Sequence, residues 1–279
     1  MKSIWKHAPA RFRIGLISMA ILVLLAFIVT LFYSGADVIL FNTHPRNRPP
    51  SLRYLMGTTS MGQDIFWMLL FSLRNSIIIG MIVATIGTVV GVLYGLSSGF
   101  TGGAVDRVMM TISDTFIVIP ALPVLILMTA LTGSTLGVLP LALILGVFAW
   151  AHPARHIRAI CLSMRERDFI QTARFSGEKT LQIIVTEILP YLWTWALSNF
   201  MNALLVAIGQ ESMLAVLGLS SARLATLGNM IQWARNRGAL MSGFWMWIGS
   251  PIVTIVVLFI SLFMLISGYN EYFAKRRGV

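Results

Sequence analysis

Six mostly apolar runs, each near the length of about 20 residues that a helix needs to cross a bilayer, limit what this chain can fold into. The chain is 57% hydrophobic and only 11% charged, which is more apolar surface than a soluble domain can bury. We therefore predict an all-α integral membrane protein with about six transmembrane helices. The runs lie at residues 14–33, 77–96, 115–131, 136–150, 191–208 and 245–266.

The runs also set the expected division of the chain. Pro120, Pro123 and Pro140 fall in the third and fourth runs, so the ends of these two helices are the hardest to place. The first run follows a basic start, as in a secretory signal, but its length and the missing cleavage site favour a retained anchor. We expect a cytoplasmic segment at 1–13, an anchor helix at 14–33, an outer loop at 34–76, a core transmembrane domain at 77–268 containing a polar loop at 165–190, and a cytoplasmic tail at 269–279.

The positive charges predict the orientation, because lysine and arginine resist translocation. If both termini are cytoplasmic, Arg46, Arg48, Arg53, Arg74, Arg223, Arg235 and Arg237 lie outside, and the other 14 of the 21 basic residues lie inside. These 14 include Lys2, Lys6, Arg107, Arg155 and Arg277. The net charge of +11 is thus mainly a topology signal, and we expect a multi-pass protein of a bacterial inner membrane that binds the lipid bilayer and no nucleic acid.

Catalytic patterns are missing from the sequence. It has no phosphate-binding GxxxxGK[ST] loop, no HExxH and no GxSxG, so we predict no catalytic residue and no ATP hydrolysis by this chain. Its single cysteine, Cys161, excludes an internal disulfide and a cysteine-based zinc site. His152 and His156 are spaced to share a helix face, but a place at the membrane boundary is favoured over metal binding, so we expect no metal and no bound cofactor.

Glycines recur every four residues through the second apolar run, at Gly87, Gly91, Gly95 and Gly99. This spacing places them on one helix face, where a neighbouring helix can approach closely. Tight helix packing is favoured over a direct role in gating, although a smooth seam also permits sliding.

The longest hydrophilic stretch, at 165–190, lies between two apolar runs, where a membrane protein can present it to a soluble partner. Within it Ala173 stands four residues before Gly177, and Leu189–Pro190 follow twelve residues after that glycine. This spacing resembles the signature loop of ABC-importer permeases.

Further motifs, from about residue 10 to the end, extend the resemblance. The segment GTTSMGQD at 57–64, followed by Arg74 and Ser76, is similar to the region before the second span of dipeptide, oligopeptide and nickel ABC permeases. The short length and single anchor span resemble the C-type subunit of this family, which has oligosaccharide-transporting relatives. Further similar motifs follow in the same order at 102–107, at Asp114 with Pro120, at 154–158, at Glu211 with 217–219, and at 228–230.

The resemblance implies a type I ABC importer permease fold and a set of partners. These are a second homologous permease subunit that completes a heterodimer, two ABC ATPase subunits that use ATP and Mg, and an extracytoplasmic solute-binding protein. The polar loop is then the coupling element, with short helices at 169–176 and 178–185 broken at Gly177. The family pattern begins with glutamate where this chain has Gln171, so any charged anchor must come from Glu166, Arg174, Glu178 or Lys179. The implied coupling residues are Gln171, Ala173, Arg174, Phe175, Ser176, Gly177, Glu178, Lys179, Leu189 and Pro190.

The solute path is less defined by the sequence. The candidates for the path or its gate are Glu211, Gln210, Pro120 and Pro123. Glu211 is a candidate because an ionisable group at membrane depth faces a cavity or a partner. A hydrogen-bonded tie from Glu211 to the following loop, for instance to Arg223, is slightly favoured over direct contact with solute. Oligopeptides and oligosaccharides are at near parity as solutes, and nickel is behind both. A homo-oligomeric channel without an ATPase is the alternative function, and a membrane enzyme lacks a catalytic set.

Overall fold

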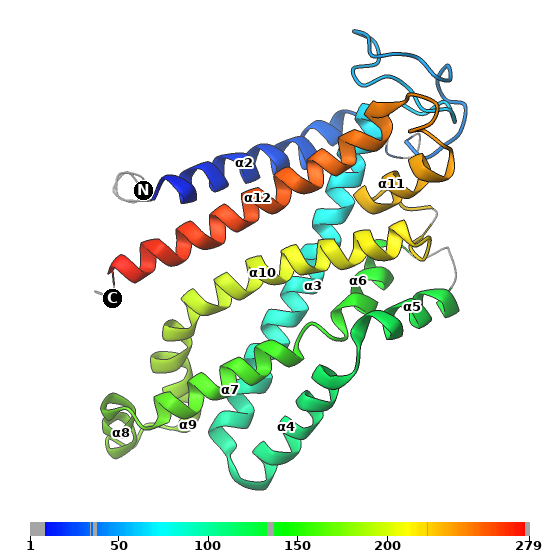
Figure 1. The fold of residues 1–279 in the computed structure, drawn as a ribbon. Helices are drawn as coiled ribbons and strands as arrows, with labels where there is room; N and C mark the ends of the chain where they lie inside the picture. The colour runs from blue at the N-terminus through cyan, green and yellow to red at the C-terminus, as the bar shows by residue number, and fades with distance from the viewer. Residues whose placement is uncertain (1–8, 34, 36–37, 133–136, 222, 277–279) are drawn as a thin grey trace.

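The computed structural model describes residues 9–33, 35, 38–132, 137–221 and 223–276 (Figure 1). In this part of the chain every regular element is a helix, apart from one isolated bridge between Thr58 and Asp64. The prediction of an all-α protein is therefore confirmed. Lys2, Lys6 and Arg277, which entered the prediction of orientation, lie outside the described residues.

Four continuous helical stretches are long and apolar enough to cross a membrane: Ala10–Phe32, Ile65–Thr101, Thr180–Val216 and Trp245–Phe273. The first comprises α2 (Ala10–Phe27) and the 3₁₀ helix η1 (Val29–Phe32), and the second is α3 (Ile65–Thr101). The third ends in α10 (Leu189–Val216), and the fourth lies in α12 (Trp245–Arg276).

Two further candidate spans are bent helix pairs. Helix α4 (Gly103–Val118) meets α5 (Ala121–Thr132) at 78°, and α6 (Val138–Gly146) meets α7 (Ala151–Arg165) at 48°. Pro120 lies in the first bend. The helix breaks there because proline has no N–H to donate to the helical hydrogen bonds. Each bent pair counts as one span if about six spans are present, as predicted.

Helix α3 organises the bundle. It lies between the α2–α12 pair and the green helices α6 and α7 in Figure 1, and it also packs against α10. Its buried side chains Met68, Ile77 and Ala84 belong to a core that includes residues of α2, α10 and α12. The short helix α11 (Leu227–Asn236) covers one end of this core.

Helix α3 begins at Ile65, whereas the second apolar run begins at residue 77. Asp64 caps it by accepting bonds from the N–H groups of Phe66 (2.9 Å) and Trp67 (3.4 Å). Burial raises the pKa of the Asp64 carboxyl above its usual value, against the opposing effect of these two bonds. Arg74, expected in the outer loop, therefore lies inside the helix, with its guanidinium carbon 5.9 Å from the centre of the Phe27 ring.

At the other end of the chain, α12 continues to Arg276, so the expected tail at 269–279 is helical up to that residue. Between α3 and α4 the chain makes only a turn at Gly102 and Gly103, both with positive φ, and Asp106 and Asp114 lie on α4. There Asp106 pairs with Arg158 of α7 at 2.6 Å.

The glycine seam faces α7 and the bend before it. A Cβ atom on Gly87 would lie 2.8 Å from the carbonyl oxygen of Ala149, and one on Gly91 would lie 2.5 Å from Cβ of Pro153. Near the C-terminal end of α3, a Cβ on Gly99 would lie 2.8 Å from Cβ of Cys161. All three distances are shorter than real Cβ contacts, so the seam allows α3 and α7 to pack closely.

Candidate coupling hairpin and transmembrane cleft

The polar loop folds into a helical hairpin whose first arm is α8 (Asp168–Phe175). The arm ends where Gly177 adopts φ +82°, a left-handed conformation that glycine reaches at little cost. The N–H of Ser176 donates to the carbonyl of Thr172 (2.9 Å), and the N–H of Glu178 donates to the carbonyl of Ala173 (3.2 Å). The second bond, together with the left-handed glycine, forms a Schellman C-cap.

This cap accounts for the glycine at position 177, which supplies the left-handed turn. The accepting group at position 173 is a backbone carbonyl, which any residue would supply, so the cap does not account for the alanine there. No atom lies within 4 Å of a Cβ placed on Gly177, which shows that the glycine is required for its backbone angle and not for space.

The hairpin has one attached face and one open face. On the attached face Ile170 of α8, Ile183 and Ile188 are buried with Leu96 of α3 and Ile157 of α7. On the open face the apolar side chain of Phe175 is 87% exposed, and those of Phe169 and Leu181 are also exposed. The hairpin is therefore anchored to the bundle while its tip presents apolar surface outward.

The second arm differs from the predicted helix at 178–185. It consists of α9 (Thr180–Ile183) and a π-helical turn (η2, Ile184–Ile188), which continues directly into α10. In an α-helix residue 190 would donate its N–H to the carbonyl of Thr186, and Pro190 has no N–H to donate. The π turn precedes this position, so Leu189 and Pro190 begin α10 and do not end a separate loop.

The polar residues of the hairpin are mostly open to solvent. Gln171, Ser176 and Lys179 are exposed, and Glu178 is half-buried. Arg174 lies on α8, but its side chain is outside the described part of the structure.

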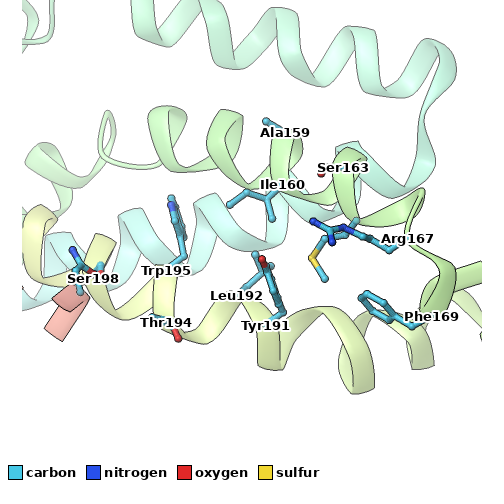
Figure 2. Close-up of a pocket in the computed structure, with 12 residues that line it drawn as sticks. Ala159, Ile160, Ser163, Arg167, Phe169, Tyr191, Leu192, Thr194, Trp195 and Ser198 are labelled. Carbon is cyan, nitrogen blue, oxygen red and sulfur yellow. Dashed lines mark hydrogen bonds between the residues drawn. The ribbon is translucent and has the colours of Figure 1, made fainter. Parts of the chain in front are cut away.

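A hollow of about 800 Å³ lies between α7, the start of the hairpin and α10 (Figure 2). Arg167 and Phe169 lie at one end, and Trp195 and Ser198 of α10 lie toward the other. Asn270 of α12 also contributes to the wall, and its Oδ1 accepts from the Ser198 hydroxyl at 2.7 Å. Sequence reasoning did not identify this hollow, because its wall combines residues far apart in the chain.

A second hollow of about 670 Å³, here called the transmembrane cleft, lies between the α4–α5 bend, the start of α7 and the middle of α10. Of the four residues predicted for the solute path, Pro120 and Gln210 line it, whereas Pro123 and Glu211 are not among its lining residues. The two hollows adjoin, since His156 on the cleft wall has its ring centre 6.2 Å from that of Trp195.

Glu211 is fully buried beside α3 and the start of α11. The Ser76 hydroxyl donates to Glu211 Oε2 (3.4 Å), and Ser76 Oγ accepts from the N–H of Leu227 (3.1 Å), the first residue of α11. The favoured interpretation was a hydrogen-bonded tie to the following loop, with Arg223 as the suggested partner. Glu211 instead bonds to the side chain of Thr226 in that loop and to Ser76 of α3.

We expect Glu211→Ala to lower the free energy of unfolding by about 1–3 kcal/mol, because the Ser76 hydroxyl would be left without its buried acceptor. Glu211→Gln keeps an acceptor oxygen in the same place and should retain more stability. Thermal unfolding of the purified variants, all in the same detergent, measures their order of stability. Gln210→Ala is the matched control, since Gln210 lines the cleft on the next position of α10 and should change little. Equal melting temperatures for Glu211→Ala and Gln210→Ala would contradict the tie.

The chain is similar to membrane subunits of known transport systems. The profile of the family described as "Binding-protein-dependent transport system inner membrane component" matches residues 87–279. The oligopeptide transport system permease protein OppC of Bacillus subtilis is 31% identical over 235 residues, which cover 82% of this chain and 76% of the relative. The dipeptide permease DppC of the same organism is 31% identical over 225 residues, covering 77% and 66%.

A third relative, OppC of Mycobacterium tuberculosis strain H37Rv, is 32% identical over 171 residues. The match covers 61% of this chain and 59% of the mycobacterial protein, so the chain spans less than two thirds of that relative's length.

Proposed function

Because this chain belongs to the family of binding-protein-dependent transport system inner membrane components, we propose that it is the transmembrane permease subunit of an ATP-driven importer of short peptides. Its bundle has the type I permease fold of this family. We propose that it forms one half of the translocation path and couples to ATPases through the hairpin at residues 165–190.

Peptides are the proposed solute because the named relatives are oligopeptide and dipeptide permeases. The sequence alone placed oligosaccharides at near parity, and the relatives favour peptides over both oligosaccharides and nickel. Oligopeptides and dipeptides have the same repeating main-chain groups, so one path can accept peptides of different lengths.

The observation that carries the proposal is the open face of the hairpin. A buried isoleucine cluster anchors the hairpin to α3 and α7, while Phe175 is exposed at the tip. An exposed apolar side chain on a rigid helical turn suits a helix-in-groove contact with a soluble partner. We propose that the soluble partner is one of the two ATPase subunits of the importer, which would hold ATP and Mg. The permease chain itself is proposed to be non-catalytic.

The proposed assembly also contains a second homologous permease and an extracytoplasmic solute-binding protein. Both chain ends are proposed to be cytoplasmic in a bacterial inner membrane. The start of α2 and the end of α12 lie at the same end of the bundle as α8 in Figure 1, and this arrangement supports a common side for the termini and the hairpin. Closure of the ATPases on ATP would then move the hairpin and rock the spans.

Affinity purification of the tagged chain from its own membranes tests the assembly. We expect recovery of a second six-span permease and of P-loop ATPases, identified by mass spectrometry. Phe175→Asp should lose the ATPases and retain the second permease, because a charge at the exposed tip opposes burial in an apolar groove. Leu52→Asp, at a fully exposed leucine of the outer loop, is the control and should retain both partners.

Two results would count against the proposal. Recovery of the chain alone as a defined oligomer would favour a channel. Retention of the ATPases by Phe175→Asp at the unchanged level would remove the tip of the hairpin from the contact.

A further inference from the structure

The transmembrane cleft has a polar wall on α10. Asn199, Asn202, Val206 and Gln210 line it at positions i, i+3, i+7 and i+11, which fall on one face of a helix. The side chain of Asn199 is oriented by α3, because its Nδ2 donates to Thr88 Oγ1 of that helix at 3.0 Å. Asn202 is exposed and points away from the buried side of α10, where Leu204 packs into the core.

The opposite wall adds hydrogen-bonding groups without a carboxylate, ammonium or guanidinium. His152 and His156 of α7 supply imidazoles, and the remaining lining residues are apolar. None of the residues that line the cleft in the described structure is Asp, Glu, Lys or Arg.

Four charged residues of the neighbouring helices α4 and α7 form two ion pairs. Arg155, between the two histidines in sequence, binds Asp114 at 2.9 Å, and Arg158 binds Asp106 at 2.6 Å. Arg167 belongs to the adjoining inner hollow and not to the cleft. The cleft itself therefore carries amides and imidazoles but no fixed charge.

Polar side chains at this depth are costly when they face hydrocarbon, so a row of them indicates a wet cavity or a partner surface. Neutral amides both donate and accept hydrogen bonds, as do neutral imidazoles. A peptide main chain presents one donor and one acceptor at each residue whatever its side chains. A wall with a fixed charge would instead discriminate between acidic and basic peptides, because Coulomb interactions extend over several ångströms.

We propose that the cleft is one half of a charge-neutral path that holds peptides by their main chain and passes acidic and basic peptides equally, and that the exposed amide of Asn202 is one of the groups that contact them. This inference rests on the proposed function of the chain as a peptide permease. It goes beyond that function by assigning the wall of the path and the physical basis of its selectivity.

The test uses the whole importer, with the second permease, the ATPases and the binding protein, in proteoliposomes. Three peptides that differ only in a central Lys, Ala or Glu are tested one at a time. Each is supplied at a concentration that saturates the binding protein, so that different affinities of the binding protein for the three peptides do not affect the uptake rates. For the unaltered chain we expect the three ATP-dependent uptake rates to agree within about threefold. Asn202→Asp should raise the Lys-to-Glu uptake ratio about tenfold, and Asn202→Lys should lower it about tenfold. Asn202→Gln, which keeps a neutral amide, is the control and should leave the ratio unchanged.

A second measurement does not depend on transport by the charged variants. The native Cys161 is fully buried, so a new cysteine in the otherwise unaltered chain can be labelled selectively. In the assembled importer Asn202→Cys should react with a charged, water-soluble thiol reagent, and saturating peptide-loaded binding protein with ATP should change the rate. Leu204→Cys, two residues away and buried against α3, should stay unreactive.

Unchanged Lys-to-Glu ratios in both charged variants, with ATP-dependent uptake retained, would overturn the inference and leave the peptide-permease function intact. A strong charge preference of the unaltered importer at saturation would overturn it as well, and so would an unreactive Asn202→Cys. Absence of any ATP-dependent peptide uptake by the unaltered importer would instead refute the proposed function, and the inference with it.

Discussion

Gly177→Pro is expected to abolish ATP-driven uptake while the chain remains inserted in the membrane. Proline fixes φ near −65°, whereas Gly177 has φ +82°, so the turn between the two arms of the hairpin cannot form. Without the turn, the bond from the N–H of Glu178 to the carbonyl of Ala173 is lost and Phe175 is no longer presented at a fixed angle. Uptake of a labelled peptide and ATP hydrolysis, measured on the same proteoliposomes, should show uptake at background with hydrolysis no longer stimulated by the loaded binding protein.

A graded series at the same position separates the backbone angle from side-chain bulk. Asn adopts the left-handed conformation more readily than other non-glycine residues, so Gly177→Asn should retain most uptake, and Gly177→Ala should lose more at a strain of about 1 kcal/mol. No neighbouring atom opposes either side chain. Normal coupled uptake by Gly177→Pro would show that the hairpin is not the coupling element.

Gly95→Leu should have the largest effect on stability. A Cβ on Gly95 would collide with the backbone carbonyl of Ala154 and lie 2.7 Å from Cβ of Ile157, both on α7. Backbone atoms cannot rotate aside, so α3 and α7 must separate, at a cost of about 3 kcal/mol or more. We expect a strongly reduced amount of full-length chain in the membrane and a lower thermal unfolding temperature of what remains.

Gly249→Leu is the control for this substitution. Gly249 also lies on a long apolar helix, α12, but a Cβ there meets no atom within 4 Å. Its leucine variant should accumulate to the level of the unaltered chain. If Gly95→Leu accumulated equally well, the seam would not be required for the packing of α3 against α7.

Several features of the fold were readable from local sequence. Hydropathy and span length are properties of about 20 consecutive residues, so each apolar run overlaps a helix in the structure. The two bent pairs extend beyond their runs, because α7 and most of α4 lie outside residues 115–131 and 136–150. The four-residue spacing of the glycines predicted a closely packed helix face, because helical geometry alone places Gly87 and Gly91 on one side. Which helix fills that face, α7, was not contained in the spacing.

The second apolar run was expected to begin at residue 77, whereas α3 begins at Ile65, and the difference has a physical cause. Residues 65–73 are mainly apolar, but the polar residues at 74–76 interrupt the run, and two of them, Asn75 and Ser76, have partners in the fold. Asn75 Nδ2 donates to the carbonyl of Ala225 at 2.7 Å, and Ser76 bonds to Glu211. A satisfied polar group can lie in a helix within the bundle, and a single-sequence pattern does not show whether it is satisfied.

The sequence by itself determined the membrane class, the apolar runs, the glycine seam and the polar stretch at 165–190, because each depends on residues only a few positions apart. The turn at Gly177 was implied by the resemblance to ABC-importer permeases. The tertiary structure decided the partners of Glu211, which include Ser76 of α3, and the assembly of the neutral cleft from α7, α10 and the bend at Pro120. These contacts join helices far apart in the chain, and their geometry is set by how the helices pack, which no local pattern encodes.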